Sequence, residues 1–203
     1  MTQIVRPRYR MLDLYSGLGG ASEAMVRAGW SVYRLENNPA LTEIERTYEM
    51  DVLTLDPEWL RDIGPIDLLW ASPPCLEFSL AYMAPGPLAQ REGRVFEPDL
   101  GLIKKAIQVR DENDPRFWCF ENVRGAIRHW EPLLGPPTQI IGPFVLWHNL
   151  PRIILPYEFE HLKKDNDTWS TEPLRANIKG KIPIEISEAV LNAVITPTLE
   201  EFQ

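Results

Sequence analysis

Short apolar runs alternate with amphipathic segments along the first part of the chain. Apolar runs of four to six residues predict strands that are buried on both faces, as in a parallel sheet. The predicted strands cover residues 10–14, 30–35, 51–52, 66–71 and 117–120. The predicted helices cover residues 21–28, 41–50 and 100–111. This alternation predicts an α/β fold with a mostly parallel sheet and helices on both faces.

The pattern changes after Val123, where prolines become frequent. Two further strands are predicted at residues 144–147 and 153–155, a polar loop at 161–171 and a closing amphipathic helix at 186–195. We expect residues 1–203 to form a single domain, in which about 125–185 is a reduced, proline-rich region. Long ordered loops on an α/β sheet are typical ligand-binding segments.

Composition narrows the class of protein. The chain has 203 residues, 44% hydrophobic and 25% charged, which excludes disordered, collagen-like and coiled-coil proteins. Its formal net charge of −8 disfavours a non-specific nucleic-acid coat but leaves a local basic face open. No apolar run approaches the ~20 residues of a membrane helix, and the first residues lack a signal-peptide pattern. We expect a cytoplasmic protein with no membrane association.

The metal-binding residue types are few and scattered. Two cysteines, Cys75 and Cys119, cannot build a cysteine-rich zinc site, and the three histidines show no metal-ligand spacing. We therefore expect no metal. The cysteines are interpreted as thiols in a reducing compartment, one of them reactive.

Three features outline a nucleoside pocket at the carboxyl ends of adjacent strands. The first strand runs into a glycine-rich turn, Asp13-Leu14-Tyr15-Ser16-Gly17-Leu18-Gly19-Gly20, where the backbone can approach a ligand closely. Glu36 follows the second strand, where an acid accepts hydrogen bonds from a ribose diol. Asp51 ends the third strand, beside an adenine amino group or plain water. Each feature alone is equally compatible with a tight turn or a solvated carboxylate.

Two further segments carry reactive groups. Cys75 follows two prolines at the end of a buried strand, in the segment Ala71-Ser72-Pro73-Pro74-Cys75-Leu76-Glu77-Phe78-Ser79. A lone cysteine is usually a small buried hydrophobe, but a stiff loop beside a ligand pocket favours a nucleophile. Glu121 directly follows the apolar run 117–120, so partial burial raises its pKa and lets it hold a proton. A helix-capping or solvated carboxylate is the competing interpretation.

The segments DLYSGLGG, SPPCLEFS and ENV, in this order, resemble motifs of the DNA cytosine-5 methyltransferases. The resemblance runs from about Met11 to Gly125, extends weakly to residues 182–195, and implies a Rossmann-like methyltransferase fold. It implies that the cofactor is S-adenosyl-L-methionine, bound by Asp13, Tyr15, Gly17, Gly19, Gly20, Glu36, Asn37, Asp51, Val52 and Pro74. It also implies that Cys75 is the nucleophile and that Glu121 contacts the target base.

Elementary chemistry agrees with these roles. Carbon 5 of cytosine is too electron-poor to attack a methyl group, and addition of a thiolate to carbon 6 converts the ring into a nucleophilic enamine. A neutral Glu121 would stabilise the charge that develops at ring N3. The target cytosine cannot be reached inside a duplex, so it must be flipped out or already unpaired.

The sequence departs from the family in two places. The family carries a Q-x-R-x-R strand whose arginine holds the cytosine O2; Gln139 matches the glutamine, but Ile141 and Pro143 replace the arginines. Arg124 and Arg128, which follow Glu121, are the favoured substitutes and Arg152 is a third, although phosphate contact or surface charge explains them equally well. The second departure is that residues 156–181 are too few for a target-recognition domain, which predicts low sequence selectivity.

Several functions stay open. The leading hypothesis is methyl transfer to DNA, and a second is the same reaction on RNA. A third is a catalytically weak cofactor-binding subunit or regulator, and an oxidoreductase would explain the glycine turn alone. Target recognition by a partner subunit or by a homodimer is a rival to low selectivity.

Overall fold

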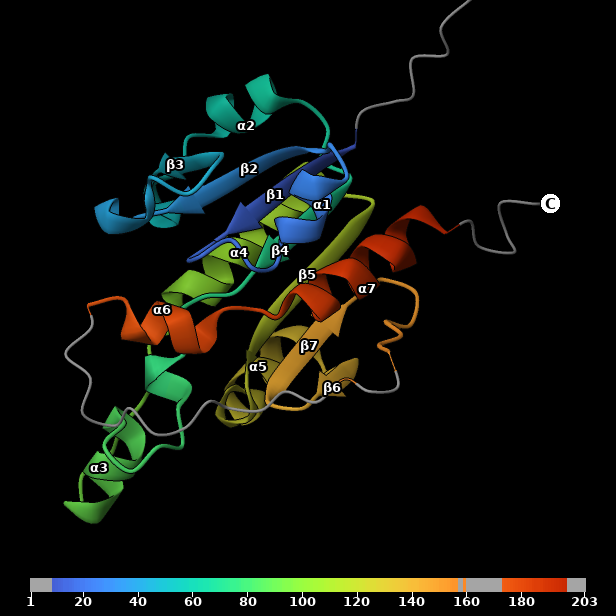
Figure 1. Ribbon diagram of the computed structural model, residues 1–203. Helices are drawn as coiled ribbons and strands as arrows, with labels where there is room; N and C mark the ends of the chain where they lie inside the picture. Colours follow the sequence, from blue (N-terminus) through green and yellow to red (C-terminus); the bar gives the residue numbers. More distant parts are fainter. Residues whose placement is uncertain (1–8, 157–158, 160–172, 197–203) are drawn as a thin grey trace, which may run out of the picture.

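The computed structural model describes residues 9–156, 159 and 173–196 and builds them around a seven-stranded sheet (Figure 1). The strand order is β3-β2-β1-β4-β5-β7-β6. The strands are β1 (Arg10–Leu14), β2 (Ser31–Glu36), β3 (Thr47–Glu49), β4 (Leu68–Ala71), β5 (Phe117–Val123), β6 (Gln139–Ile141) and β7 (Phe144–His148). The first five run parallel, whereas β7 is antiparallel to β5 and β6, so the predicted α/β sheet is confirmed.

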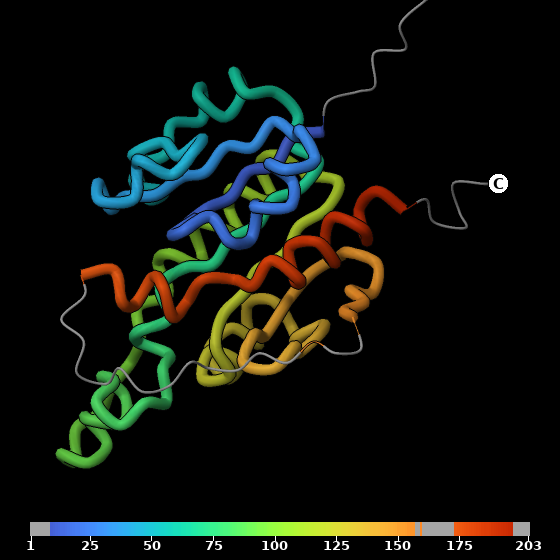
Figure 2. Tube along the Cα trace, viewed as in Figure 1, coloured from blue at the N-terminus to red at the C-terminus, as the bar shows by residue number. Residues whose placement is uncertain are grey.

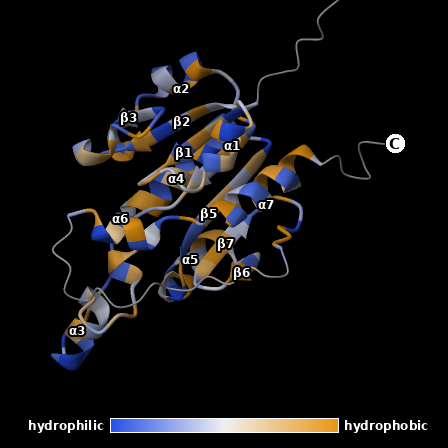
Figure 3. Cartoon of the chain, in the orientation of Figure 1, coloured by the Kyte–Doolittle hydropathy of each residue, from blue (hydrophilic) through white to orange (hydrophobic). Residues whose placement is uncertain are grey.

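Helices cover both faces of this sheet. They are α1 (Glu23–Arg27), α2 (Pro57–Ile63), α3 (Pro85–Arg91), α4 (Gly101–Asn113), α5 (Ile127–Leu134), α6 (Arg175–Gly180) and α7 (Ile184–Ile195). One apolar cluster packs α1 and α7 against the sheet, and a second packs α2, α4 and α5 against the other face. Figure 2 shows α7 running beside α1 across one face of the sheet, and Figure 3 shows β7 coloured as largely hydrophobic.

Two predictions near the third strand are wrong. Residues 41–50 form no α-helix: a short 3-10 helix, η1 (Pro39–Leu41), is followed by β3. Arg46 has a positive φ of 65°, which ends any helix, and Tyr48 of β3 stacks on Tyr33 of β2 with ring centroids 6.1 Å apart. Residues 51–52 are no strand either, because the Asp51 carboxylate caps the 3-10 helix η2 (Val52–Thr54).

Other boundaries also differ from expectation. β5 continues to Val123, so Glu121 lies inside the strand and not after it. Residues 153–155 are not a strand; the Gln139 side-chain amide instead pairs with the backbone of Ile153. The short elements α2, α3, α5, α6 and β6 were not predicted. The predicted loop at 161–171 falls outside the described residues.

The parallel arrangement brings four strand ends to one edge of the sheet. The carboxyl end of β1 leads into the glycine-rich turn, and β2 ends at Glu36. The carboxyl end of β4 leads into the Cys75 loop, and Glu121 lies near the carboxyl end of β5. Figure 1 places α3 and α6 at this same end. Ligands of open α/β sheets bind outside the carboxyl ends of the strands, which marks this edge as the candidate site.

Candidate active site

The glycine-rich turn after β1 has an unusual backbone. Tyr15, Gly17 and Gly19 adopt positive φ values of 59°, 51° and 69°. The Tyr15 hydroxyl anchors the turn by donating to the backbone oxygen of Leu102 at 2.9 Å. The Gly17 amide donates to Glu36 Oε2 at 2.9 Å, so the turn is tied to the end of β2. Glycine is favoured at positions 17 and 19, because it adopts positive φ without the steric cost that a side chain brings.

Gly19 and Gly20 have packing reasons of their own. A Cβ on Gly19 would lie 2.5 Å from the Arg34 guanidinium carbon, and one on Gly20 would lie 2.3 Å from the Ile182 backbone oxygen. The turn is therefore sandwiched between β2 and the segment that leads into α7. Ser187 of α7 adds a contact to the chain directly after the turn: its hydroxyl accepts from the Ala24 amide of α1 at 3.0 Å and donates to the Ala21 backbone oxygen at 2.7 Å. The turn is held from both sides, which presents its outer amides in one geometry.

Asp13 lies beneath the turn and not on its ligand-facing side. Its side chain is 1% exposed and accepts a hydrogen bond from the Ser22 hydroxyl at 2.5 Å. Burial raises the pKa of Asp13 to about 6, although Ser22 and Arg34 lower it. Arg34 was not predicted to belong to this region. The sequence feature that could have indicated it is a single positively charged residue within the mostly apolar strand β2.

The predicted nucleoside-binding residues lie along neighbouring strand ends. Glu36 is half-buried and accepts from the Gly17 amide and, at 3.0 Å, from the Asn38 amide. A carboxylate has about four acceptor positions, so two remain for ribose hydroxyls. Asn37 and Asp51 are exposed, and Val52 is buried at the base of this region. The Asp51 charge raises the pKa of Tyr15, after the larger effect of burial, so Asp51 also belongs to this edge.

The loop that carries Cys75 is stiff and clamped from the neighbouring strand. The amide of Ser72 donates to the Leu14 backbone oxygen at 3.2 Å, and Asn122 Nδ2 donates to the Pro73 oxygen at 2.9 Å. Pro74 and Cys75 are exposed residues, so this part of the loop faces solvent at the edge of the sheet. The short helix η3 (Leu76–Phe78) begins directly after Cys75.

A second clamp holds η3 from the other side. The short helix η4 (Arg124–Ala126) packs on η3 so closely that a Cβ on Gly125 would lie 1.9 Å from the Phe78 backbone oxygen. Asn122 and Gly125 thus fix the Cys75 loop through backbone groups. Neither role is predictable from the sequence, because both depend on which loop packs beside which strand.

Glu121 is a buried acid on the strand next to this loop. Its side chain is 8% exposed, and burial raises its pKa to about 7, while a hydrogen bond from Ser72 lowers it. Ser72 Oγ also accepts from Trp70 Nε1 at 2.7 Å, which fixes the hydroxyl. A carboxyl group with this pKa is partly protonated near neutral pH and can donate a proton to a base. The expected rise in the pKa of Glu121 is confirmed.

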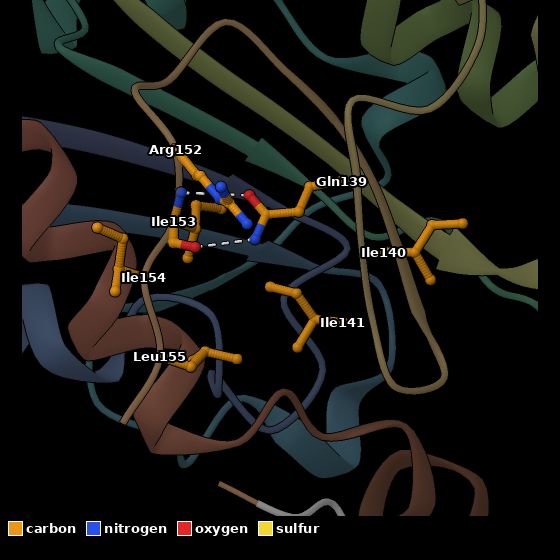
Figure 4. A pocket seen from close by; sticks show the side chains of 7 residues that line it. All are labelled: Gln139, Ile140, Ile141, Arg152, Ile153, Ile154 and Leu155. Atoms are coloured by element: carbon orange, nitrogen blue, oxygen red, sulfur yellow. Dashed lines mark hydrogen bonds between the residues drawn. The ribbon is translucent and has the colours of Figure 1, made fainter. Parts of the chain in front are cut away.

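The candidate arginines occupy different places. Arg124 is exposed, and its Nη2 donates to the Gly142 backbone oxygen at 3.1 Å; Arg128 is exposed and donates to His129 at 2.8 Å. Arg152 lies elsewhere, beside Gln139 in a cavity of about 550 Å³ at the outer edge of the sheet (Figure 4). Arg124 therefore remains the arginine nearest in sequence to Glu121 that has donors to spare.

Metal ligands do not gather anywhere in the part of the chain that the structure describes. Among these residues, three or more histidine, cysteine or acidic side chains never meet in a group able to hold a metal ion. The described helices are also too short or too polar to span a membrane.

Comparison with known proteins gives a family and several relatives. The model of the C-5 cytosine-specific DNA methylase family matches residues 9–132. The type II methyltransferase M1.HphI of Haemophilus parahaemolyticus is 30% identical over 131 residues, covering 58% of this chain and 33% of the relative. The type II methyltransferase M.NgoMIV of Neisseria gonorrhoeae is 31% identical over 125 residues, covering 59% and 37%. The chain thus spans about a third of the length of these relatives.

Among solved structures, the Entamoeba histolytica methyltransferase EhMeth is similar at 14% identity and a TM-score of 0.41. The likeness covers 59% of this chain and 39% of that protein.

Proposed function

Since the chain belongs to the C-5 cytosine-specific DNA methylase family, we propose that it transfers a methyl group from S-adenosylmethionine to carbon 5 of cytosine in DNA. One observation carries the proposal: Cys75 is exposed in the loop after β4, and the buried, partly protonated Glu121 lies on the adjacent strand β5, whose Asn122 donates to the Pro73 backbone oxygen of that loop. A nucleophile and an acid placed together are what addition across the cytosine ring requires.

The residues at the glycine-rich turn fit the cofactor. The Glu36 carboxylate, already oriented by two backbone amides, has acceptor positions left for the ribose hydroxyls. Asn37, Asp51 and Val52 are assigned to the adenine side, and Tyr15, Gly17 and Pro74 to the rim of the pocket. Asp13, Gly19 and Gly20 would act from beneath, by shaping the turn. S-adenosylmethionine supplies an electrophilic methyl group when it is bound.

The protein's own groups then carry the reaction. The Cys75 thiolate forms a bond to carbon 6, and the displaced π electrons move onto the ring while Glu121 donates its proton to N3. Carbon 5 takes the methyl group, and the proton on carbon 5 leaves to a base. The bond between sulfur and carbon 6 then breaks with its electron pair returning to sulfur, and N3 gives its proton back to Glu121, which restores the aromatic ring, the thiolate and the protonated acid. Arg124 is assigned to the cytosine O2, to which it would donate through the guanidinium N–H groups that do not bind the Gly142 oxygen.

We further propose one catalytic domain whose substrate side is the region 125–185, with little sequence selectivity of its own. Base readout needs several side chains delivered to a groove by a rigid platform, and each good bidentate pair contributes ~1–3 kcal/mol of discrimination. The described part of this region offers the short elements α5, β6, β7 and α6. Selection would therefore extend to the flipped cytosine and its nearest neighbour.

The test is transfer of a labelled methyl group to DNA and to RNA of the same sequence, followed by bisulfite sequencing of the DNA. We expect label in DNA, spread over many sequence contexts. Label in RNA alone would support the RNA methyltransferase instead. Methylation confined to one motif of four or more base pairs would refute low selectivity. Methylation that needs an added protein would show that a partner subunit recognises the target sequence.

A further inference from the structure

Strand β2 buries a full positive charge directly below the glycine-rich turn. Arg34 is 4% exposed, although arginine is almost never buried without partners. A buried cation is costly unless its donors and its charge are both satisfied. The reason for its presence must therefore lie in what it contacts.

The Arg34 guanidinium makes three directed hydrogen bonds. Nε donates to Ser22 Oγ at 2.8 Å, Nη2 to the Gly19 backbone oxygen at 3.0 Å and Nη1 to the Glu45 backbone oxygen at 2.8 Å. The Ser22 hydroxyl in turn donates to the buried Asp13 carboxylate. The network thus joins β2, the turn and the end of β1, and the Asp13 charge balances that of Arg34.

Two residues of β2 hold the turn at two points. Arg34 and Glu36 are two positions apart, so their side chains leave the strand on the same face. Glu36 accepts from the Gly17 amide, and Arg34 donates to the Gly19 oxygen. The guanidinium also fills the space that a Cβ on Gly19 would need. The turn conformation is therefore matched to this arginine.

We propose that Arg34 is a positioning residue for the cofactor: it holds the Gly17–Gly19 turn in the shape that receives S-adenosylmethionine. The inference rests on the proposed function. It goes beyond that function because Arg34 lies behind the turn, acts through Gly19 and Ser22, and takes no part in methyl transfer to the base.

The test compares Arg34→Lys with a surface control, Arg61→Met. Lysine keeps a charge opposite Asp13 but lacks the planar fork that reaches three acceptors. Arg61 lies on α2 with a side chain that is 67% exposed, so its replacement leaves the turn alone. Calorimetry gives the dissociation constant for S-adenosylmethionine, a thermal melt reports folding, and the methylation rate is measured at saturating cofactor.

For Arg34→Lys we expect the dissociation constant to rise about tenfold, the effect of one lost charge-assisted hydrogen bond. We expect the rate at saturating cofactor to stay near that of the parent, because Cys75 and Glu121 are untouched. Arg61→Met should match the parent in both. A general loss of structure would lower both the rate and the affinity. A lower affinity with an unchanged rate therefore identifies Arg34 as a positioning residue.

Ser22→Ala provides a second variant should Arg34→Lys fail to fold. It removes the hydroxyl between Arg34 and Asp13 but introduces no new charge, and we expect it to weaken cofactor binding severalfold. Unchanged affinity in a folded Arg34→Lys or Ser22→Ala protein would overturn the inference while the proposed function stands. A parent protein that does not bind S-adenosylmethionine at all would overturn the proposed function itself, and the inference with it.

Discussion

Replacement of Glu121 by glutamine should make the protein more stable and less active at the same time. Glutamine keeps the shape of the side chain and cannot ionise. The Glu121 carboxyl is 8% exposed and its pKa is raised by burial from 4.5 to about 7. Ionisation of the buried group is therefore unfavourable in the folded protein, and the unfolded chain loses this proton first as the pH rises.

The sign and size of the effect follow from this pKa. Below pH 4.5 both states are protonated, so the parent and Glu121→Gln should have similar stability. Between pH 4.5 and about 7 the parent loses stability as the pH rises, because only the unfolded state has released its proton. At about 1.36 kcal/mol per pKa unit, the loss approaches ~3 kcal/mol above pH 7. Asp13 titrates in the same range, but it is present in both proteins and cancels.

The assay is urea unfolding of both proteins at a series of pH values from 4 to 9. The difference in free energy of unfolding should grow in favour of Glu121→Gln up to about pH 7 and then level off. Methyl transfer by the same variant should fall sharply, because it delivers no proton to N3. A difference that stays constant over the whole pH range would refute the burial argument.

The other predictions concern the pocket and the two clamps. Glu36→Ala should weaken S-adenosylmethionine binding by about 1–3 kcal/mol, with a smaller loss for the exposed Asp51→Ala; unchanged calorimetric affinity in both would place the nucleoside elsewhere. Gly125→Ala should slow single-turnover methylation at normal cofactor affinity, because its Cβ displaces the Phe78 backbone; a parent-like rate would show that η3 tolerates the shift. Asn122→Ala should lower the rate because it removes the hydrogen bond to the Pro73 oxygen, and unchanged kinetics would deny Asn122 a role in holding the loop.

The parallel core was predictable because its strands are apolar on both faces. The predicted ranges 10–14 and 66–71 agree with β1 and β4 to within two residues. The region 41–50 was not predictable in the same way. Its conformation depends on a positive φ at Arg46 and on aromatic contacts between Tyr48, Tyr33 and Trp59, which join segments distant in sequence.

The candidate site shows the same division. Cys75 and Glu121 could be singled out because each follows or ends an apolar run and carries reactive chemistry. The residues that hold the surrounding loops could not be singled out in this way. Asn122, Gly125 and Arg34 contact backbone atoms of loops that come near them only in the folded chain. Gln139 shows the converse: it was matched to a motif by type and spacing, yet its amide pairs with the Ile153 backbone at the sheet edge.

The central claim, that Cys75 attacks the cytosine ring, is tested most directly by trapping. DNA that contains 5-fluorocytosine blocks the final elimination, so the protein should stay covalently bound to it in the presence of S-adenosylmethionine. The buried Cys119 provides the matched control, because it is 0% exposed within β5 and out of reach of a base. We expect a covalent complex for the parent and for Cys119→Ala, and none for Cys75→Ala. A complex that persists in Cys75→Ala, or disappears in a folded Cys119→Ala, would contradict the assignment of Cys75 as the nucleophile.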